Sequence, residues 1–449
     1  MSDLSLRSRR VVTPEGIRPA VVHVVGGRIA GVYDEPPPHL QPRDLGDLVL
    51  MPGLVDTHVH VNDPGRADWE GWETATRAAA SGGVTTLVDM PLNSSPVTTS
   101  AAALDAKRRA ADDASLFADV GFWGGAVPGN REALSDLARA GVAGAKAFLC
   151  HSGIDEFPAS DEDALIDAMG ALAEHDLPLL VHAELEREAD LDRAALAALP
   201  PDDYRAWLLA RPPSFEENAV RRAIDLARRT GCRVHVVHLS AASALPMLRR
   251  AKEEGLPVTV ETCPHYLGLS AEEVGRGATW FKCAPPIRSE SNREQLWQGL
   301  RDGVIDFVVS DHSPCTSDLK CTQSGDFTEA WGGISSLGLG LPILWAEASA
   351  RGFDVADVGR WLASGPADFA GLAQKGRIAV GADADLVAWD PDADWRPGEA
   401  DVHFKNKLSP WLGRAVKGRI TATWLRGEPV WRDGEHGRPA GTELLRETR

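Results

Sequence analysis

Two histidines at the end of a short apolar segment are the first residues whose types and spacing suggest chemistry. The segment reads Gly53-Leu54-Val55-Asp56-Thr57-His58-Val59-His60. In an extended chain alternate side chains share a face, so His58 and His60 point to the same side. Neutral imidazole is the commonest metal-ligand side chain, so two imidazoles aimed at one point can clamp a metal ion. A solvated or hydrogen-bonded histidine pair is the alternative, and residues further along the chain must distinguish the two.

One lysine lies inside an otherwise apolar segment, Gly144-Ala145-Lys146-Ala147-Phe148-Leu149. An isolated buried ammonium is very costly, so Lys146 must be paired, neutral or chemically changed. Desolvation lowers the pKa of a lysine and makes it a nucleophile. Reaction with carbon dioxide would give N6-carboxylysine, an anionic carbamate whose two oxygens can bridge two metal ions. The alternative is an ion pair between Lys146 and Asp311 or another carboxylate, with no metal.

The elements that must position these residues alternate between apolar strands and amphipathic helices, which predicts a parallel α/β architecture. The expected strands are Leu50–His58, Thr85–Met90, Asp119–Val127, Gly144–Leu149, Pro178–Ala183, Arg233–Ser240, Pro257–Cys263 and Asp306–His312. The expected helices are Trp72–Ser81, Ser100–Asp112, Asn130–Ala140, Asp161–His175, Glu216–Thr230, Ala242–Glu254 and Asn292–Arg301, with Ser214 as a start signal before Glu216. This alternation predicts a (β/α)8 TIM barrel.

The two chain ends have a different pattern. Val21–Val32, Gly376–Asp390 and Gly418–Arg432 each read as two strands joined by a glycine turn. We therefore expect residues 1–50 and 376–449 to form one small β-sandwich domain beside a hydrolase barrel of residues 51–375.

The barrel brings the ligand-type residues together, because the carboxyl ends of all its strands face one mouth. His182 and His238 could each be a core histidine, and Asp311 could cap a turn with Ser313. Such accidents would have to occur on five separate strands. We therefore predict two divalent metal ions held by His58, His60, Lys146, His182, His238 and Asp311.

A charge count supports a bridged pair of ions. Two divalent cations, neutral histidines, an ionised Asp311, a carbamate on Lys146 and a bridging hydroxide leave a charge of about +1, enough to polarise a carbonyl. Imidazole and carboxylate ligands suit zinc, with cobalt, manganese or iron as replacements.

These residues resemble the amidohydrolase superfamily and, within it, the cyclic amidohydrolases, which are the dihydroorotases, the hydantoinases or dihydropyrimidinases, and the allantoinases. The resemblance covers nearly the whole chain, including the late segment Gly381–Val387. The superfamily's ligand set is two histidines on the first strand, a carboxylated lysine, two further histidines and a final aspartate. All six positions match in this chain.

The resemblance is greatest to the allantoinases. The segments that support it are Asp56–Arg66 with Trp69-Glu70-Gly71, Asp89–Ser94, Lys146–Cys150, Phe281–Arg288, Ser310–Pro314 and Lys405–Pro410. Dihydroorotases place an arginine two residues after the second histidine, to bind a substrate carboxylate. Asn62 stands there in this chain and cannot form a bidentate cationic clamp, so a neutral ring such as allantoin is favoured.

The resemblance also implies substrate contacts. Asn93 would hydrogen-bond a ring amide, although a turn before Ser94-Ser95-Pro96 is the alternative. His151 stands where hydantoinases have a tyrosine, which counts against a hydantoinase and leaves the role of His151 open. Ala284 and the Gly332-Gly333 pair would offer backbone groups to the ring.

The resemblance thus predicts hydrolysis of allantoin to allantoate by a bridging hydroxide, with Asp311 as general base and then general acid. A hydantoinase or dihydropyrimidinase is the alternative, a dihydroorotase is disfavoured, and a scaffold on the same fold is disfavoured by the complete ligand set. Related proteins are often tetramers, so a homotetramer is expected.

Composition fits a soluble cytoplasmic enzyme. The 449 residues have a formal net charge of −18, which argues against nucleic acid and anionic membranes as partners. No apolar run reaches the roughly 18 residues of a membrane span, and Met1–Arg10 lacks the apolar core of a signal peptide. The six cysteines read as reduced thiols. Cys315 and Cys321 could form a disulfide or a metal site, but two unrelated thiols are favoured.

Overall fold

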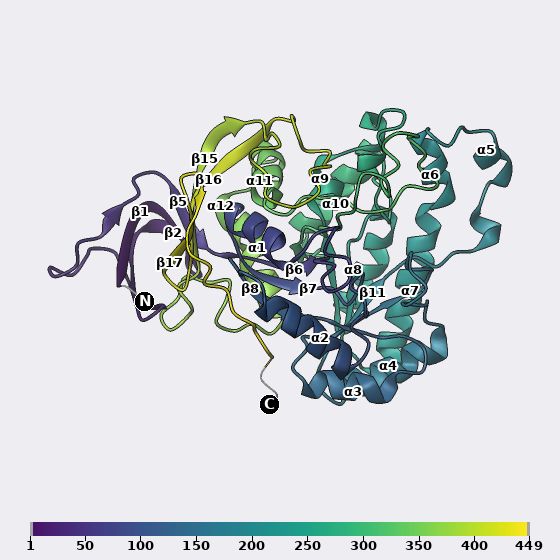
Figure 1. Cartoon of the computed structure of the whole chain (residues 1–449), viewed down its shortest axis with the longest axis horizontal. Helices are drawn as coiled ribbons and strands as arrows, with labels where there is room; N and C mark the ends of the chain where they lie inside the picture. The colour runs from purple at the N-terminus through teal and green to yellow at the C-terminus, as the bar shows by residue number, and fades with distance from the viewer. Residues whose placement is uncertain (1–2, 447–449) are drawn as a thin grey trace.

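A parallel β-barrel forms the larger part of the protein in a computed structural model that describes residues 3–446 (Figure 1). Its strands are β6 (Leu54–Val59), β7 (Val84–Asp89), β8 (Asp119–Phe122), β9 (Gly124–Gly125), β10 (Ala145–Phe148), β11 (Leu179–His182), β12 (Val234–Val236), β13 (Val258–Thr262) and β14 (Phe307–Val308). The strands β6 to β8 and β9 to β14 form two parallel sheets. The backbone N–H of His60 donates to the carbonyl of His312 at 2.8 Å and joins the first strand to the last. The predicted α/β barrel is confirmed.

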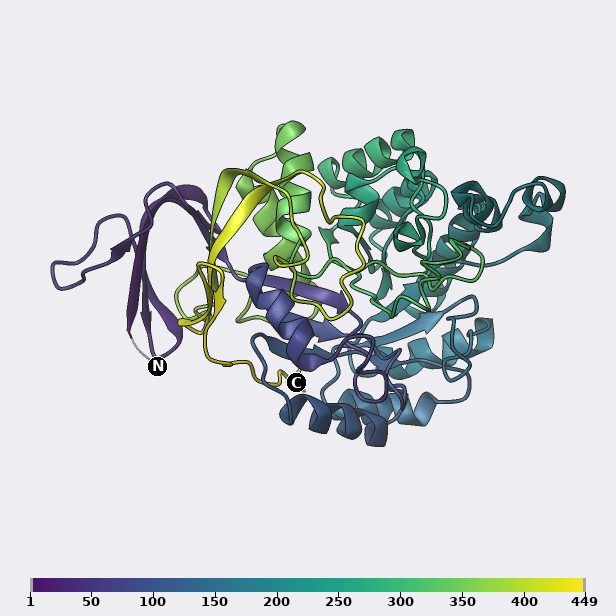
Figure 2. The same ribbon diagram turned by 45° about the horizontal axis from the view of Figure 1, so that its top comes forward.

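Helices surround these strands (Figures 1 and 2). The predicted ones appear as α1 (Trp72–Ser81), α2 (Ala101–Asp112), α3 (Arg131–Arg139), α4 (Glu162–Ala173), α7 (Pro213–Thr230), α8 (Leu245–Glu253) and α10 (Glu290–Arg301). Further helices are α5 (Arg193–Ala197), α6 (Tyr204–Ala210), α9 (Pro264–Gly268), α11 (Gly340–Ala350), α12 (Val355–Gly359) and α13 (Gly365–Phe369).

The predicted start of α7 at Glu216, after Ser214, is wrong. The helix begins at Pro213, and its N-cap is Pro212, which makes no side-chain cap hydrogen bond. A proline at the first helical position needs no N–H partner, and its fixed φ already suits a helix. Glu216 instead lies inside the helix, buried, where it pairs with Arg288.

The two chain ends meet in one mixed sheet, drawn at the left of Figure 1. Its strands are β1 (Leu4–Thr13), β2 (Gly16–Val25), β3 (Arg28–Tyr33), β4 (Arg43–Asp44), β5 (Val49–Pro52), β15 (Leu386–Trp395), β16 (Val416–Leu425), β17 (Glu428–Arg432) and β18 (Glu435–His436). The order is β18-β17-β16-β15-β5-β1-β2-β3, with β4 beside β1. The antiparallel pairing of β15 with β5, for example Val387 opposite Met51, joins the two ends of the chain.

Two of the predicted hairpins are confirmed by their turns. Gly26 and Gly27, with φ of 59° and 83°, connect β2 to β3, and Arg426 and Gly427, with φ of 46° and 78°, connect β16 to β17. Positive φ at both central residues suits a tight hairpin, because it matches the twist of the flanking strands.

The third predicted hairpin, Gly376–Asp390, is wrong, because this stretch contains only the start of β15. The residues before β15 are instead fixed by buried charges. The Nζ of Lys375 lies 2.6 Å from Asp119 and 2.7 Å from Asp385, and the backbone N–H of Gly53 donates to the Asp385 carbonyl. These contacts connect the terminal sheet to the start of β8. Lys375 and Asp385 therefore help to hold the terminal sheet against the barrel.

Several predicted strands are shorter than expected. The first divides at Gly53 into β5, which belongs to the terminal sheet, and β6 of the barrel. Strands β12 and β14 end at Val236 and Val308, before the residues of the mouth. The domain limits at residues 50 and 376 stay a prediction. Residues 1–2 and 447–449 of the predicted terminal domain lie outside the described residues.

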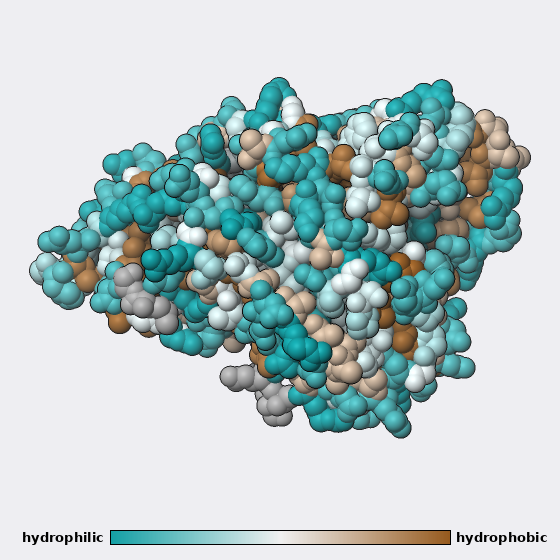
Figure 3. Space-filling view, in the orientation of Figure 1, coloured by the Kyte–Doolittle hydropathy of each residue, from teal (hydrophilic) through white to brown (hydrophobic). Residues whose placement is uncertain are grey.

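The surface drawn in Figure 3 is mostly hydrophilic, with apolar residues scattered over it. Among residues 3–446, none of the helices combines the length and the apolar composition that crossing a bilayer would require.

Candidate metal centre

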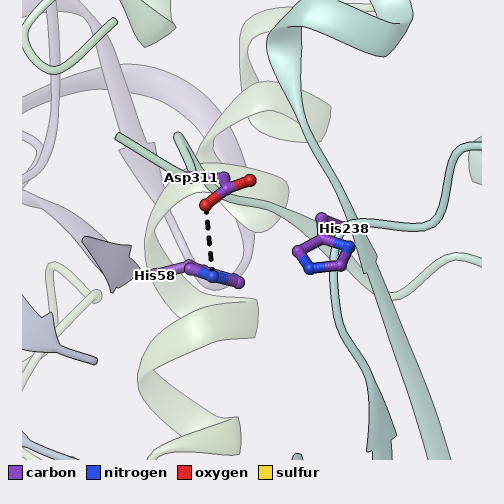
Figure 4. A group of neighbouring side chains, drawn as sticks. All are labelled: His58, His238 and Asp311. Atoms are coloured by element: carbon purple, nitrogen blue, oxygen red, sulfur yellow. Dashed lines mark ion pairs between the residues drawn. The ribbon is translucent and has the colours of Figure 1, made fainter. Parts of the chain in front are cut away.

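The six predicted ligand residues converge at the mouth of the barrel. His58 lies in β6 and His60 directly after it, Lys146 in β10 and His182 at the end of β11. His238 lies just beyond β12, and Asp311 just beyond β14. One ligand atom from each of His58, His238 and Asp311 lies within 4.8 Å of the others (Figure 4).

Short distances link the remaining members to this trio. The Nε2 of His58 lies 3.2 Å from Asp311 Oδ1 and 3.1 Å from Lys146 Nζ, and the Nε2 of His60 lies 3.7 Å from Asp311 Oδ1. The rings of His182 and His238 are 4.6 Å apart between centroids. The structure therefore brings all six residues into one cluster.

Burial keeps the histidines of this cluster uncharged. Desolvation lowers the pKa of His58, His60, His182 and His238 below the ordinary histidine value. Neutral imidazole is the form that binds a metal ion, since ligands must be deprotonated.

Lys146 and Asp311 have opposite pKa shifts. Burial lowers the pKa of Lys146 and raises that of Asp311, while the charge of each group opposes the shift of the other. No direct ion pair joins Lys146 to a carboxylate anywhere in residues 3–446, although its side chain is buried. A buried amine with a lowered pKa and no ion-pair partner has the reactivity that carbamate formation needs.

A buried glutamate fixes the orientation of His58. Glu261, in β13, accepts the Nδ1–H of His58 at 2.5 Å on one oxygen. Its other oxygen lies 3.0 Å from Nε2 of His235, whose Nδ1 contacts the Thr259 hydroxyl at 2.8 Å. With its proton held on Nδ1, His58 presents the lone pair of Nε2 to Lys146 and Asp311, as a metal ligand must.

Two other histidines are oriented in a similar way. The Nδ1 of His60 donates to the carbonyl of Leu92 at 2.6 Å, which leaves its Nε2 facing Asp311. The Nε2 of His182 lies 2.8 Å from Glu184, which also binds Arg211 at 2.6 Å. Burial alone would raise the pKa of Glu184, but Arg211 and His182 lower it to about 2, so this glutamate is ionised.

The backbone supports the cluster at strained positions. Asn62, His238 and Asp311 have φ of 65°, 40° and 44°, a region that residues other than glycine rarely adopt. Such strain persists only where surrounding structure imposes it, and it gathers at functional sites.

The predicted substrate residues are placed less uniformly. Asn62 and Asn93 are both buried at the mouth, where the Nδ2 of Asn93 donates to Oδ1 of Asn62 at 3.2 Å. Ala284 and Gly332 are neighbours, since a Cβ added to Gly332 would lie 3.6 Å from Cβ of Ala284. His151 is exposed, with its Nδ1 on the backbone N–H of Gly153 and its Nε2 3.5 Å from Asp155, so the structure does not bring it to the six ligand residues.

Several residues of the site were missed by sequence reasoning, namely His235, Glu261, Glu184, Arg211 and Arg66. Glu261 could have been found by the argument used for Lys146, because it is a charged residue inside an apolar strand. Arg66 lies near the mouth, donates to the Asn93 carbonyl at 2.5 Å and pairs with Glu156 at 3.1 Å. Its charge is thus already paired with a carboxylate.

The cysteines follow the favoured expectation. All six lie within the described residues and all are free thiols, so Cys315 and Cys321 form no disulfide.

Comparisons with known proteins agree with the geometry of this site. The sequence model of the amidohydrolase family matches residues 49–430. The chain is 51% identical to the allantoinase of Streptomyces avermitilis over the full length of both proteins. It is 45% identical to the allantoinase of Arabidopsis thaliana, over 97% of this chain and 89% of that protein. Among solved structures, the L-hydantoinase (dihydropyrimidinase) from Arthrobacter aurescens superimposes with a TM-score of 0.92 at 29% identity, over 99% of this chain and 100% of that one.

The role of Glu261 can be tested by metal affinity. We expect Glu261→Gln to weaken binding of a divalent cation by about 10- to 100-fold, since the amide cannot replace a carboxylate partner of His58. Competition with a chromogenic chelator measures this directly. Glu294→Gln, which alters an ion pair with Arg351 on the surface, is the control and should bind metal like the unaltered protein. Unchanged affinity in Glu261→Gln would show that this carboxylate does not hold the ligand.

Proposed function

The chain belongs to the amidohydrolase family, and from this premise we propose that it hydrolyses the cyclic amide bond of allantoin to give allantoate. The observation that supports this most is the full-length identity of 51% to an allantoinase, together with six ligand-type side chains that converge at the mouth of the barrel. The alternative, a hydantoinase or dihydropyrimidinase, has the same fold in solved relatives, but at 29% identity or less in those compared.

Members of this family bind divalent metal, and the donors at the mouth fit such an ion. We propose that His58, His60, Lys146, His182, His238 and Asp311 hold two ions, with Lys146 as its carbamate. Nitrogen and oxygen donors favour zinc, and cobalt, manganese or iron could replace it. When bound, such ions lower the pKa of water and polarise a carbonyl.

The residues around the ring perform the remaining tasks in this proposal. A carboxylate oxygen of Asp311 accepts a proton from the attacking water and delivers it to the ring nitrogen as the C–N bond breaks.

The mouth itself suits a neutral ring. The paired amides of Asn62 and Asn93 offer uncharged hydrogen-bonding groups, and Ala284 and Gly332 offer backbone groups. His151 stays a candidate for a substrate contact only if its exposed loop moves toward the mouth. A homotetramer and a cytoplasmic location are part of the same proposal.

The substrate is tested by kcat/KM on allantoin, hydantoin, dihydrouracil and dihydroorotate, with zinc, cobalt or manganese supplied in bicarbonate. We expect allantoin to be preferred about a hundredfold, or about 2.7 kcal/mol of transition-state binding. Preference for hydantoin or dihydrouracil would leave the metal chemistry in place but replace the substrate.

The proton-transfer role predicts that Asp311→Asn retains much of its metal but loses turnover by about 10²- to 10⁴-fold. The amide keeps an oxygen ligand and cannot exchange the proton. Asp302→Asn, on the surface beside Arg249, is the matched control. Near-normal kcat in Asp311→Asn, with metal bound, would exclude this role.

The carbamate predicts that Lys146→Ala loses the second ion and regains part of its activity with short carboxylic acids. These acids can supply the bridging oxygens that the carbamate would provide. Metal analysis by mass spectrometry, together with kcat at increasing acetate or propionate, measures both effects. Two tightly held ions in Lys146→Ala would contradict the bridge.

A further inference from the structure

Residues 328–333, which follow Asp311 in the chain, lie beside the mouth of the barrel. Two buried lysines, Lys282 and Lys320, hold them there, and the proposed chemistry uses neither. Only 2% of Lys320 and 4% of Lys282 is exposed. Within residues 3–446 neither has a carboxylate at ion-pair distance, although a buried charge normally requires a partner. Both use backbone carbonyls instead.

Lys320 donates hydrogen bonds to two stretches of backbone, at residue 282 and at residues 331–333. Its Nζ donates to the carbonyl of Lys282 at 2.9 Å, to that of Trp331 at 2.8 Å and to that of Gly333. An ammonium has three protons, and all three are used here. The backbone N–H of Gly333 also donates to the Lys282 carbonyl at 2.9 Å, so one ammonium locks residue 282 against residues 331–333.

The side chain of Lys282 adds further hydrogen bonds between residue 282 and the stretch before Trp331. Its Nζ donates to the carbonyls of Ala330 at 2.5 Å and Thr328 at 3.3 Å, and it lies 4.1 Å from the ring centroid of Trp207. Burial and the nearby charge of Lys320 lower the pKa of Lys282 to about 7. The two lysine amines are therefore held close together by carbonyls and an aromatic face.

The two stretches that the lysines join are the ones that bear Ala284 and Gly332. A Cβ on Gly332 would lie 3.6 Å from the backbone nitrogen of Ala284, and a Cβ on Gly333 would lie 2.2 Å from the Ser313 carbonyl. The backbone at Gly333 thus packs so closely against Ser313 that a larger residue would not fit. Any shift of residues 331–333 would change the spacing of the backbone groups that face the ring.

We propose that Lys320 is a positioning residue for substrate binding: its ammonium sets the separation of Ala284 and Gly332 and thereby the fit of the cyclic ureide. This inference rests on the proposed function of the same mouth. Because Lys320 touches neither the six ligand residues nor the attacking water, its loss should weaken binding while the metal and the chemical step remain.

The test compares Lys320→Met with the unaltered full-length enzyme under metal and bicarbonate. We expect KM for allantoin to rise about tenfold or more, with kcat within about threefold and an unchanged metal-to-protein ratio. Lys252→Met is the matched control, since Lys252 lies on the outside of the barrel in an ion pair with Asp306 and should leave all three quantities unchanged. A merely structural lysine would lower the amount of active enzyme instead, and KM would stay constant.

A second variant guards against loss of folding. Lys320→Gln keeps two N–H donors without a charge, so we expect an intermediate KM. A folded Lys320→Met or Lys320→Gln enzyme with KM within about twofold of the unaltered one overturns the proposal, as does a fall in kcat and metal content at constant KM.

If neither variant folds, hydrogen–deuterium exchange of Asp311→Asn with allantoin decides. Joint protection of the amides in 282–284 and 331–333 supports the proposal, and absence of protection in either stretch overturns it. Failure of the proposed function is recognised separately, because the unaltered enzyme would then not hydrolyse allantoin at all. The KM comparison would in that case be made on whichever of hydantoin or dihydrouracil it hydrolyses.

Discussion

A buried lysine amine against a histidine nitrogen is the constraint on which the mouth of this barrel depends. Lys146 Nζ and His58 Nε2 are 3.1 Å apart, and both side chains are almost fully buried. Two carboxylates flank this contact, with Glu261 on Nδ1 of the same histidine and Asp311 beside Nε2. Charged groups so close together in a medium of low dielectric constant are stable only when their charges balance. In the proposed centre, divalent cations and a carbamate on Lys146 would supply that balance.

Glu261 changes the charge count of the site. In the proposed centre, two divalent cations, an ionised Asp311, a carbamate on Lys146 and a hydroxide would leave a charge of about +1, and an ionised Glu261 beside His58 would bring the total near zero. Burial raises the pKa of Glu261, and the charge of Lys146 opposes that shift, as any cation at the donors would. The electrophilicity of the proposed centre would then come from the position of its charges rather than from an excess of positive charge.

The ligand residues and the barrel could be predicted from the sequence because each rests on a local signal. Lys146 stands out in an apolar strand, and His58 and His60 have the spacing of one strand face. Contacts between distant strands have no such signal: Glu261 meets His58 across 203 residues, and Lys320 meets Gly333 only through a folded loop. The hairpin expected at Gly376–Asp390 failed for the same reason, since Lys375 draws Asp385 into contacts with β8 that a turn pattern cannot reveal. The exposed position of His151 likewise depends on the conformation of its loop. Its nearness to Lys146 in the sequence does not reveal that position.

Lys282 and Lys320 show why carbonyls, rather than carboxylates, are suitable lysine partners near the proposed metal centre. Burial, and next to it the charge of Lys320, lowers the pKa of His265, and His265 has a ring nitrogen within 4.8 Å of a carboxylate oxygen of Asp311. A glutamate paired with Lys320 would place a further anion near Asp311. It would raise the pKa of Asp311 and compete for the proposed divalent cations. Carbonyl oxygens satisfy the ammonium protons without adding a net charge. The loop that carries Gly332 can thus be held in place by Lys282 and Lys320 without a further carboxylate beside the proposed ligands.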